Sequence, residues 1–519
     1  MAPAANSGSA PESFLMAQLL AGADDAPALW IEGMSVSRVQ LAAAAAAAAD
    51  GLAGLGLQRG DVLALWLPNC AVWLQLLFAA ARLGVLIVPI STRYKAPEMR
   101  HLLTVSRARA IVAPESFLDT AYASIARELQ ADVPTLERVI AVDDLTAWLP
   151  FRKGADPAVA AVGTAADPLC CFSTSGTTGM PKLAVHDHYG IARHAVHVAR
   201  ALDIRQGDAM LCTMPLFGVY GFFVALAALA GGARCVFLPV FDAAAAAQAI
   251  EHHRITHFIG ADGMFDEVLK LPGPQLGSWR QGVLGDFVGL AASATLRAHK
   301  LGIRVSGVYG SSECFSLMSL FPADMAPELR ARGGGVVVDP AIQWRVVDAQ
   351  SGAALADGDP GELQIRGPNL MIGYLNNQEA TAKAITGDGW FRSGDLAFAE
   401  GNAFIYLARM GDSLRLRGFL VSPAEIENCL MQHPAVALAQ VVGVNRVGIG
   451  DIAVAYVIAS PDAGVPAEEV LLAHCRGNMA SYKLPRRVIV VDEFPSINGP
   501  NGNKIQKRVL REMAQTVID

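Results

Sequence analysis

Short apolar runs alternate with helix-forming segments through the first half of the chain, and this alternation restricts the folds that the chain can adopt. Val62–Leu67 follows the turn at Gly60-Asp61, and the alanine-rich segment Ala42–Ala49 before it has a high helix propensity. Further apolar runs are Arg109–Ala113, Val139–Val142, Ala209–Cys212 and Ala233–Leu238. Short strands that alternate with helices form parallel sheets with helices on the faces. We therefore expect an α/β fold with parallel or mixed sheets.

Two longer apolar stretches, Ala71–Ile90 and Tyr220–Val240, approach the length of about 20 residues that a membrane span needs. The first stretch contains Gln75 and Arg82, and Gly231-Gly232 interrupts the second. We predict that each is a buried helix that runs into a buried strand, and we expect no membrane span.

Composition narrows the class of protein. The 519 residues carry a net charge of −7, without the clustered positive surface that nucleic-acid binding requires. The cysteines form no C-x-x-C pair, and several lie in apolar runs, as expected in the reducing cytoplasm. Residues 1–12 are rich in Ala, Ser and Pro and lack the features of a signal peptide, so we expect a disordered tail there.

The segment Ser173–Lys182 follows the apolar run Leu169–Phe172 and contains small hydroxyl residues and two glycines. This pattern predicts a buried strand that leads into a loop whose amides and hydroxyls can surround phosphate oxygens. It is not a Walker loop, because Lys182 lies between Pro181 and Leu183 and not between Gly and Ser or Thr. The predicted phosphate loop comprises Thr174, Ser175, Gly176, Thr177, Thr178, Gly179 and Lys182.

The segment Val308–Glu313 ends a predicted strand with an aromatic ring, a glycine, two hydroxyls and a carboxylate. Tyr309 offers a surface for a base, Gly310 allows close backbone approach, and Ser311 and Ser312 offer hydrogen bonds. Glu313 offers a carboxylate ligand for Mg²⁺. Further along, Gly389–Leu396 contains Asp395, whose two acceptor oxygens suit the vicinal hydroxyls of a ribose.

A polar break at Arg409-Met410-Gly411-Asp412 separates a last segment of α+β pattern from the rest of the chain. We expect helices at Pro423–Met431 and Ala467–Met479. Strands are expected at Ala437–Val444, Ile452–Ile458 and Arg487–Val491. Near the end, Lys504 follows Asn501-Gly502-Asn503, which predicts a mobile loop.

Together these motifs resemble the adenylate-forming superfamily of acyl-CoA synthetases, adenylation domains and luciferases, most closely an acyl- or aryl-CoA ligase. The likeness runs in the family's order from Ser173 to Arg511 and includes Leu67-Pro68-Asn69 near the N-terminus. It implies a large N-terminal domain of sheets flanked by helices, with a β-rich subdomain. It also implies a small mobile C-terminal α+β domain. We place the large adenylation domain at residues 13–410 and the small domain at 411–519.

The resemblance also implies roles for the residues that match the family's motifs. Thr174 to Lys182 would clamp the phosphates of ATP, Glu313 would hold Mg²⁺, and Lys504 would bridge the substrate carboxylate and the α-phosphate. Asp395 and Arg409 would contact the nucleotide. Gly411 and Asp412 would form the hinge, where the family usually has Asp or Lys at the position of Gly411. Arg415 and Gly418 would face the active site when the thioester forms.

The acyl pocket of the family corresponds to an aromatic segment after Met214. Its implied lining residues are Phe217, Gly218, Tyr220, Phe222, Gly310 and Cys314. Amino-acid-activating relatives usually place an Asp where this chain has Gly218, and a buried ammonium without a counter-charge is costly. We therefore expect an aryl, alicyclic or medium-chain acid in preference to an amino acid or acetate. Asp262 and Asp286 either cap strand ends or contact a polar substituent.

The resemblance implies an ATP-dependent carboxylic acid:CoA ligase that uses ATP, Mg²⁺ and coenzyme A and forms an acyl-adenylate and then an acyl-CoA. An alternative is a stand-alone ligase that loads the thiol of a carrier protein. More remote alternatives are a bioluminescent oxygenase and a catalytically silent nucleotide-binding protein. We expect no nucleic-acid partner, and the sequence leaves open whether the enzyme forms oligomers.

Overall fold

The structure is a computed structural model. It describes residues 19–20, 25–31, 33–142, 161–174, 181–273, 275–287, 289–410, 414–416, 419–421, 423–446, 450–461, 463–479, 481–499 and 502–518. Contacts between residues divide the chain into two units. Unit 1 comprises Met1–Val240, Ser312–Ser316 and Pro368–Thr381. Unit 2 comprises Phe241–Ser311, Leu317–Gly367 and Ala382–Asp519.

The first sheet of unit 1 has the strand order β18-β8-β7-β4-β3-β5-β6. Its strands are β3 (Val62–Leu65), β4 (Leu86–Pro89), β5 (Ala110–Ala113), β6 (Arg138–Ala141), β7 (Pro168–Thr174), β8 (Lys182–Asp187) and β18 (Gly373–Tyr374). The strands from β6 to β7 pair in parallel, whereas β8 pairs antiparallel with β7 and β18. The helices between these strands are α3 (Ala71–Leu83), α4 (Ala96–Ser106), α5 (Tyr122–Gln130) and α6 (His188–Ala201). This is the predicted parallel and mixed sheet with helical connections.

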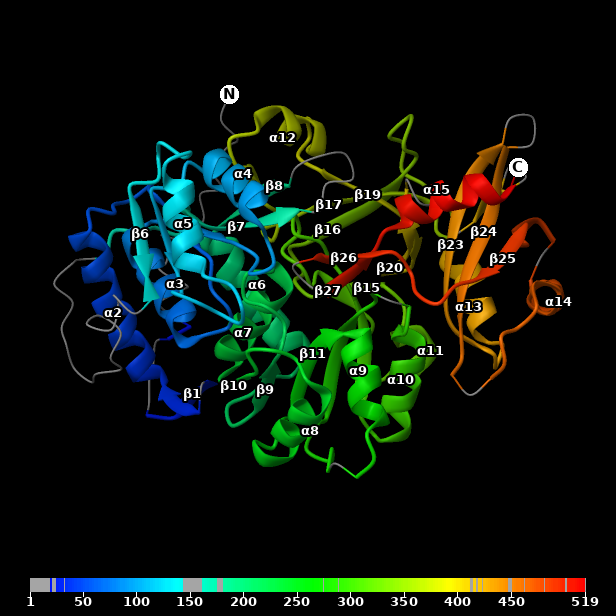
Figure 1. Ribbon diagram of the computed structural model, residues 1–519, viewed down its shortest axis with the longest axis horizontal. Coiled ribbons are helices and arrows are strands. Elements are labelled where there is room, and N and C mark those ends of the chain that lie inside the picture. Colours follow the sequence, from blue (N-terminus) through cyan, green and yellow to red (C-terminus); the bar gives the residue numbers. More distant parts are fainter. Residues whose placement is uncertain are drawn as a thin grey trace. The chain divides into compact units, whose positions relative to one another are not determined.

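Unit 1 also contains β1 (Pro27–Ile31), β2 (Met34–Ser37), β9 (Ala209–Cys212) and β10 (Arg234–Phe237). Strand β10 pairs in parallel with β9 and with β1, and β2 pairs antiparallel with β1. Helix α2 (Arg38–Gly54) begins in a capping box, in which the backbone of Gln40 donates to Ser37 Oγ and that of Ser37 to Gln40 Oε1. It packs beside α3 (Figure 1).

Both long apolar stretches fold as a buried helix followed by a buried strand. Ala71–Ile90 forms α3 and β4, and Tyr220–Val240 contains most of α7 (Val219–Gly231) followed by β10. Gly84 and Gly232 end these helices in the left-handed conformation, which glycine adopts without a steric penalty. Among the described residues, no helix combines the length and the apolar character that crossing a membrane requires.

In unit 2, parallel strands continue into an antiparallel sheet with the strand order β11-β12-β13-β14-β15-β20-β19-β17-β16. The strands are β11 (His257–Ala261), β12 (Gln281–Gly285), β13 (Arg304–Tyr309), β14 (Ser319–Leu320), β15 (Gly334–Val337), β16 (Gln343–Val347), β17 (Gly361–Arg366), β19 (Phe391–Glu400) and β20 (Ala403–Arg409). The helices are α8 (Ala243–His252), α9 (Asp262–Lys270), α10 (Ala291–Lys300) and α11 (Pro327–Arg330), and α12 (Gln378–Ala384) crosses from unit 1. The strands of the expected β-rich subdomain therefore continue the sheet that contains β13.

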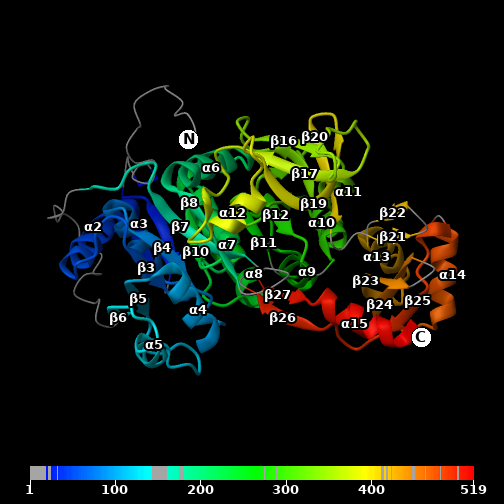
Figure 2. The ribbon, with the colours of Figure 1, turned by 90° about the horizontal axis from the view of Figure 1, so that it is seen from above.

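The C-terminal segment forms its own sheet from β21 (Leu414–Leu416), β22 (Phe419–Val421), β23 (Val436–Arg446), β24 (Gly450–Ala459) and β25 (Arg487–Val490). Helices α13 (Pro423–Met431) and α14 (Glu468–Asn478) share one apolar core with Val441 and Ala455. Helix α15 (Lys507–Ile518) packs on Val442 and Val454, which point to the other face because strand side chains alternate. Figures 1 and 2 show the helices on these two faces.

The expected loop around Lys504 is instead a hairpin strand. β26 (Ser496–Gly499) and β27 (Gly502–Ile505) pair antiparallel, with Ile497 opposite Lys504. The pairing extends from Ser496 with Ile505 to Gly499 with Gly502, and the backbone hydrogen bonds to β26 outweigh the low strand propensity of Gly and Asn. The expected tail at residues 1–12 and the domain boundary at Gly411 lie outside the described residues, so both stay predictions.

Candidate active site

The turn Ser312-Glu313-Cys314 in unit 1 is held by the carbonyls of all three residues. The carbonyl of Ser312 is 2.8 Å from His186 Nε2, that of Glu313 accepts from the backbone of Met371 at 2.8 Å, and that of Cys314 accepts from Asn369 Nδ2 at 2.8 Å. Because a carbonyl only accepts, His186 carries its proton on Nε2. Burial lowers the pKa of His186 to about 4, so the ring is neutral at pH 7. The turn therefore presents Glu313 from a fixed backbone.

The carboxylate of Glu313 contacts a tyrosine from β18. Tyr374 donates its hydroxyl proton to Glu313 Oε1 over 2.9 Å. The ring of the same tyrosine lies 4.3 Å from Lys182 Nζ, a cation–π contact. Tyr374 is opposite Ala184 in the pairing of β18 with β8, so the strand that begins at Lys182 also positions the tyrosine.

The two ends of the predicted phosphate loop lie opposite each other in an antiparallel pair. Thr174 ends β7, Lys182 begins β8, and the two residues are partners in the ladder. The carbonyl of Pro181 lies 3.1 Å from His101 Nε2, on α4. Residues 175–180, which include Ser175, Gly176, Thr177, Thr178 and Gly179, lie outside the described residues. Unit 1 thus places Lys182, at one end of the loop, on β8, the strand whose His186 anchors the turn of Glu313, with Thr174 opposite it on β7.

In unit 2, Asp395 lies in β19 and is 4% exposed. Tyr309 donates to its Oδ2 over 2.5 Å, and Arg409 Nε lies 3.1 Å from its Oδ1. Arg409 is the partner of Asp395 in the pairing of β19 with β20 and also donates to the carbonyl of Ser393 at 2.8 Å. The last residue of β13 and the adjacent strands β19 and β20 therefore bring together three of the predicted nucleotide ligands.

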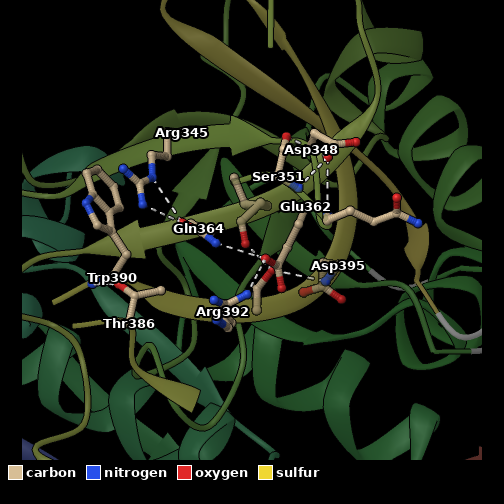
Figure 3. A network of polar contacts seen from close by, with 12 residues as sticks. Arg345, Asp348, Ser351, Glu362, Gln364, Thr386, Trp390, Arg392 and Asp395 are labelled. Atoms are coloured by element: carbon tan, nitrogen blue, oxygen red, sulfur yellow. Dashed lines mark hydrogen bonds and ion pairs between the residues drawn. The ribbon is translucent and has the colours of Figure 1, made fainter. Parts of the chain in front are cut away.

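A polar network supports the strands next to Asp395 (Figure 3). Arg345 Nε donates to Gln364 Oε1 at 3.0 Å, and Gln364 Nε2 donates to Glu362 Oε2 at 2.9 Å. Arg392 NH1 lies 3.8 Å from the same Glu362 oxygen. The Trp390 ring adds a cation–π contact with Arg345 at 4.4 Å. Since Glu362 and Gln364 are buried, this network keeps their polar groups bonded and holds β16, β17 and β19 in register.

The aromatic segment after Met214 forms the start of α7, with Gly218 as its N-cap residue. Phe217 and Tyr220 are buried, and Phe222 packs against Trp73, Phe172 and Phe315. Cys314 is fully buried, and it and the other cysteines of the chain, all of them described and buried, are free thiols. The assignment of these residues and of Gly310 to an acyl pocket stays a prediction.

Of the two acids considered near the pocket, Asp262 is fully buried and accepts hydrogen bonds from the backbones of Phe287 at 3.1 Å and Leu290 at 2.7 Å. Asp286 is exposed and accepts from the backbone of Gly289 at 3.0 Å. These contacts fit the strand-end cap that the sequence left as one of two possibilities.

Comparison with known proteins places the chain in a family. The sequence model of the AMP-binding enzymes matches residues 17–375, and that of the AMP-binding enzyme C-terminal domain matches residues 425–498. The chain belongs to the AMP-binding enzymes. The recognition of an adenylate-forming enzyme is therefore confirmed, and so is the class of an AMP-forming acid–CoA ligase.

Several relatives of this AMP-binding enzyme align over most of its length. The 3-[(3aS,4S,7aS)-7a-methyl-1,5-dioxo-octahydro-1H-inden-4-yl]propanoyl:CoA ligase of Mycobacterium tuberculosis is 33% identical, over 94% of this chain and 96% of that protein. The mitochondrial medium-chain acyl-CoA ligase ACSF2 of Bos taurus is 29% identical, over 93% and 84%. The solved structure of ATP-bound MatB from Rhodopseudomonas palustris superposes with a TM-score of 0.87 at 27% identity, over 97% and 99%. The predicted fold class is confirmed.

Other predicted site residues of this AMP-binding enzyme are described in part or not at all. Gly411, Asp412 and Gly418 lie outside the described residues. Arg415 in β21 and Lys504 in β27 are placed by their backbone alone. Sequence reasoning missed Tyr374, His186 and Asn369, which hold Glu313 and its turn. The only sequence signal for Tyr374 is a Gly-Tyr pair, which indicates no chemical role. Its contact with Glu313 depends on the pairing of β18 with β8.

Proposed function

We propose that the chain activates a carboxylic acid with MgATP and transfers the acyl group to coenzyme A, and that the residues discussed above carry this reaction. The observation that carries the proposal is the arrangement in unit 1. There Lys182, at the end of the predicted phosphate loop, and the carboxylate of Glu313 contact the same tyrosine. A cationic group for phosphate oxygens and an anionic group for a divalent cation are the two requirements of a nucleoside triphosphate site.

In the first step, a carboxylate oxygen of the substrate forms a bond to the α-phosphorus of ATP. The bond from that phosphorus to the oxygen bridging to the β-phosphorus breaks, and pyrophosphate leaves with the electron pair. Negative charge accumulates on the phosphate oxygens as this happens, and fixed positive charges stabilise it. Lys182 and the phosphate loop bind the departing phosphates, and Lys504 bridges the carboxylate and the α-phosphate.

Mg²⁺ fits the groups around Glu313. Mg²⁺ prefers oxygen ligands and is commonly held by one or two carboxylates together with substrate phosphates. Glu313 supplies a carboxylate on an anchored turn, and Ser311 and Ser312 beside it carry hydroxyls. When bound, the ion would neutralise charge on the phosphates. Glu313 is the residue that would hold it.

Asp395 binds the ribose of ATP. The carboxylate is already oriented by Tyr309 and Arg409, and the two oxygens of a carboxylate can accept several hydrogen bonds each. A buried, oriented acceptor loses little entropy when the vicinal hydroxyls bind. Arg409 is also close in the sequence to the predicted hinge at Gly411 and Asp412. A rotation of the small domain would therefore begin beside a residue that we assign to the nucleotide.

In the second step, the sulfur of coenzyme A attacks the acyl carbon of the adenylate. The bond between that carbon and the phosphate oxygen of AMP breaks, AMP leaves, and the thiol proton passes to solvent. We propose that the small domain turns about Gly411 and Asp412 before this step. Lys504 then moves away, and Arg415 and Gly418 face the acyl-adenylate. Glycine at the hinge suits such a turn, because its backbone reaches conformations that other residues avoid.

The acid we propose is an aryl, alicyclic or medium-chain acid. Phe217, Gly218 and Tyr220 are buried at the start of α7 and offer no charge to a substrate ammonium. The two relatives named above act, by their names, on an alicyclic propanoate and on medium-chain acids. Both observations favour an apolar acyl group.

The test is a hydroxamate-trapping screen over benzoates, cinnamates, alicyclic acids and C2 to C16 fatty acids, with pyrophosphate release measured in parallel. We expect acid-dependent pyrophosphate release from the whole protein, with highest activity on an apolar acid. Best activity with acetate or an α-amino acid would overturn the substrate class, and release that no acid stimulates would overturn the activity. Coenzyme A and a carrier protein offered separately distinguish the proposed acceptor from the alternative one.

A further inference from the structure

Tyr374 contacts two groups to which the proposed function assigns separate tasks. Its hydroxyl donates to Glu313 Oε1 at 2.9 Å, and its ring faces Lys182 Nζ at 4.3 Å. We propose that Tyr374 is a positioning residue for adenylation: its hydroxyl orients the metal-binding carboxylate, and its ring orients the phosphate-binding ammonium. This inference rests on the proposed roles of Glu313 and Lys182.

The backbone around Tyr374 is fixed on both sides. Ile372 donates to the carbonyl of Val185 at 2.8 Å, and Leu375 donates to that of Leu183 at 2.8 Å. The backbone N–H of Tyr374 itself donates to Thr381 Oγ1 at 2.9 Å. The side chain is 7% exposed, so it has few rotamers available. Because the backbone on either side of it is bonded to β8, the tyrosine holds the side chains that it contacts at fixed positions relative to that strand.

The hydroxyl contact suits orientation of a metal ligand. A hydrogen bond from a phenol to a carboxylate is charge-assisted and stronger than one between neutral groups. A carboxylate has about four acceptor positions on its two oxygens, so one hydrogen bond at Oε1 restricts rotation of the group and leaves it able to bind a cation. The backbone of Glu313 is held independently through its carbonyl by Met371. Tyr374 therefore acts on the side chain of a residue whose main chain is already placed.

The ring of Tyr374 contacts the second group, the ammonium of Lys182. The face of an aromatic ring attracts an ammonium group, and it holds a lysine without neutralising its charge. Lys182 is the first residue of β8, next to the predicted phosphate loop. The ring therefore fixes the position of the ammonium that we assign to the phosphates.

Two variants separate the two contacts. Tyr374→Phe keeps the ring and removes the hydroxyl, and Tyr374→Leu removes both. Tyr122→Phe is the matched control, because Tyr122 is also buried in unit 1 and donates its hydroxyl proton to the carbonyl of Thr92 at 2.8 Å, away from the site. For each full-length protein, binding of Mn²⁺·ATP is measured by electron paramagnetic resonance. Binding of metal-free ATP in EDTA is measured by calorimetry.

We expect Tyr374→Phe to weaken Mn²⁺·ATP about tenfold, the loss expected for a hydrogen bond to a charged group, and to leave metal-free ATP unchanged. We expect Tyr374→Leu to weaken metal-free ATP as well, by about threefold, because the cation–π contact is also lost. The control should bind both ligands as the unmodified protein does. A purely structural role would lower the thermal midpoint of Tyr374→Phe without changing the ratio of the two affinities.

Glu313→Gln distinguishes failure of this inference from failure of the proposed function. If Glu313→Gln binds Mn²⁺·ATP normally, the metal role of Glu313 is wrong, and the inference falls with it. If Glu313→Gln loses affinity for Mn²⁺·ATP and Tyr374→Phe does not, the proposed function stands and the role of Tyr374 is overturned.

Discussion

Tyr309 donates its phenolic proton to Asp395 Oδ2 at 2.5 Å, although the two residues are 86 positions apart in the sequence. Arg409 approaches the other oxygen of the same carboxylate at 3.1 Å. The carboxylate that we assign to the ribose is thus oriented from two sides within unit 2. This arrangement would let an aromatic residue and an acid from distant motifs serve one nucleotide.

The first prediction concerns this hydrogen bond. Tyr309→Phe keeps the ring but frees the carboxylate of Asp395 to rotate, so AMP should bind about fivefold to tenfold more weakly. Calorimetric titration with AMP measures the change. Tyr406→Phe is a suitable control, because Tyr406 packs beside Tyr309 in the same sheet. Unchanged AMP affinity in Tyr309→Phe would show that the hydroxyl does not prepare the ribose site.

The second prediction concerns Lys504. Lys504→Ala should slow adenylation by about a hundredfold or more, because a fixed charge that stabilises the transition state is lost. Thioester formation from a supplied acyl-adenylate should remain within about twofold, because the proposed rotation of the small domain withdraws Lys504 in that step. The two half-reactions are measured separately by rapid quench. Equal losses in both would contradict the proposed division of labour between the two steps.

The third prediction is a pH dependence of stability. His188 is fully buried, and burial lowers its pKa to about 4, whereas a histidine in the unfolded chain titrates near 6.5. Below pH 6.5 the unfolded chain binds the proton first. The stability contributed at neutral pH, on the order of 3 kcal/mol, is therefore lost as the pH falls from about 6.5 toward 4.

His188→Gln removes this titration, so the variant should lose about 2 kcal/mol less than the unmodified protein between pH 7.5 and pH 5. Urea unfolding at the two pH values measures the difference. His186, whose pKa burial also lowers to about 4, remains in both proteins and cancels in the comparison. An identical fall in both proteins would show that His188 does not contribute to the acid sensitivity.

The fourth prediction concerns the acyl group. Gly218 is buried at the N-cap of α7 with an extended backbone that any residue can adopt. If the position borders the acyl pocket, Gly218→Leu should shift the preferred fatty acid to a chain shorter by about three carbons, because the added side chain fills that much volume. The hydroxamate screen reads this out directly, and thermal midpoints confirm folding. An unchanged chain-length profile would place the pocket elsewhere.

Much of the fold follows from local patterns. The helix Pro423–Met431 and the strand Ala209–Cys212 were predicted with the bounds that the structure has, because their apolar periodicity and flanking turn residues agree. Both apolar stretches were correctly predicted as a helix followed by a strand. The hairpin that carries Lys504 was wrongly predicted as a loop, because its stability comes from a partner strand and not from the residues around the lysine.

The sequence predicted the motifs of the candidate site but not the contacts between its residues. Glu313 and Asp395 each lie in a segment whose residue types indicate their chemistry. Their partners Tyr374 and Tyr309 reach them through strand pairings between distant segments, and no local pattern encodes those pairings. The motif of Tyr309 predicts a surface for the base of the nucleotide. Its hydroxyl contact with Asp395 was not predictable, because it depends on the register of β19 with β20 and on where β13 ends.

The most direct test of the account follows the oxygen atoms of the acid. The full-length enzyme is given the preferred acid labelled with ¹⁸O in both carboxylate positions, together with MgATP and coenzyme A, and the products are analysed by mass spectrometry. Attack of the carboxylate on the α-phosphorus predicts one ¹⁸O atom in AMP, one in the acyl-CoA carbonyl and none in pyrophosphate. Label in pyrophosphate, or AMP without label, would contradict activation of the acid as an acyl-adenylate.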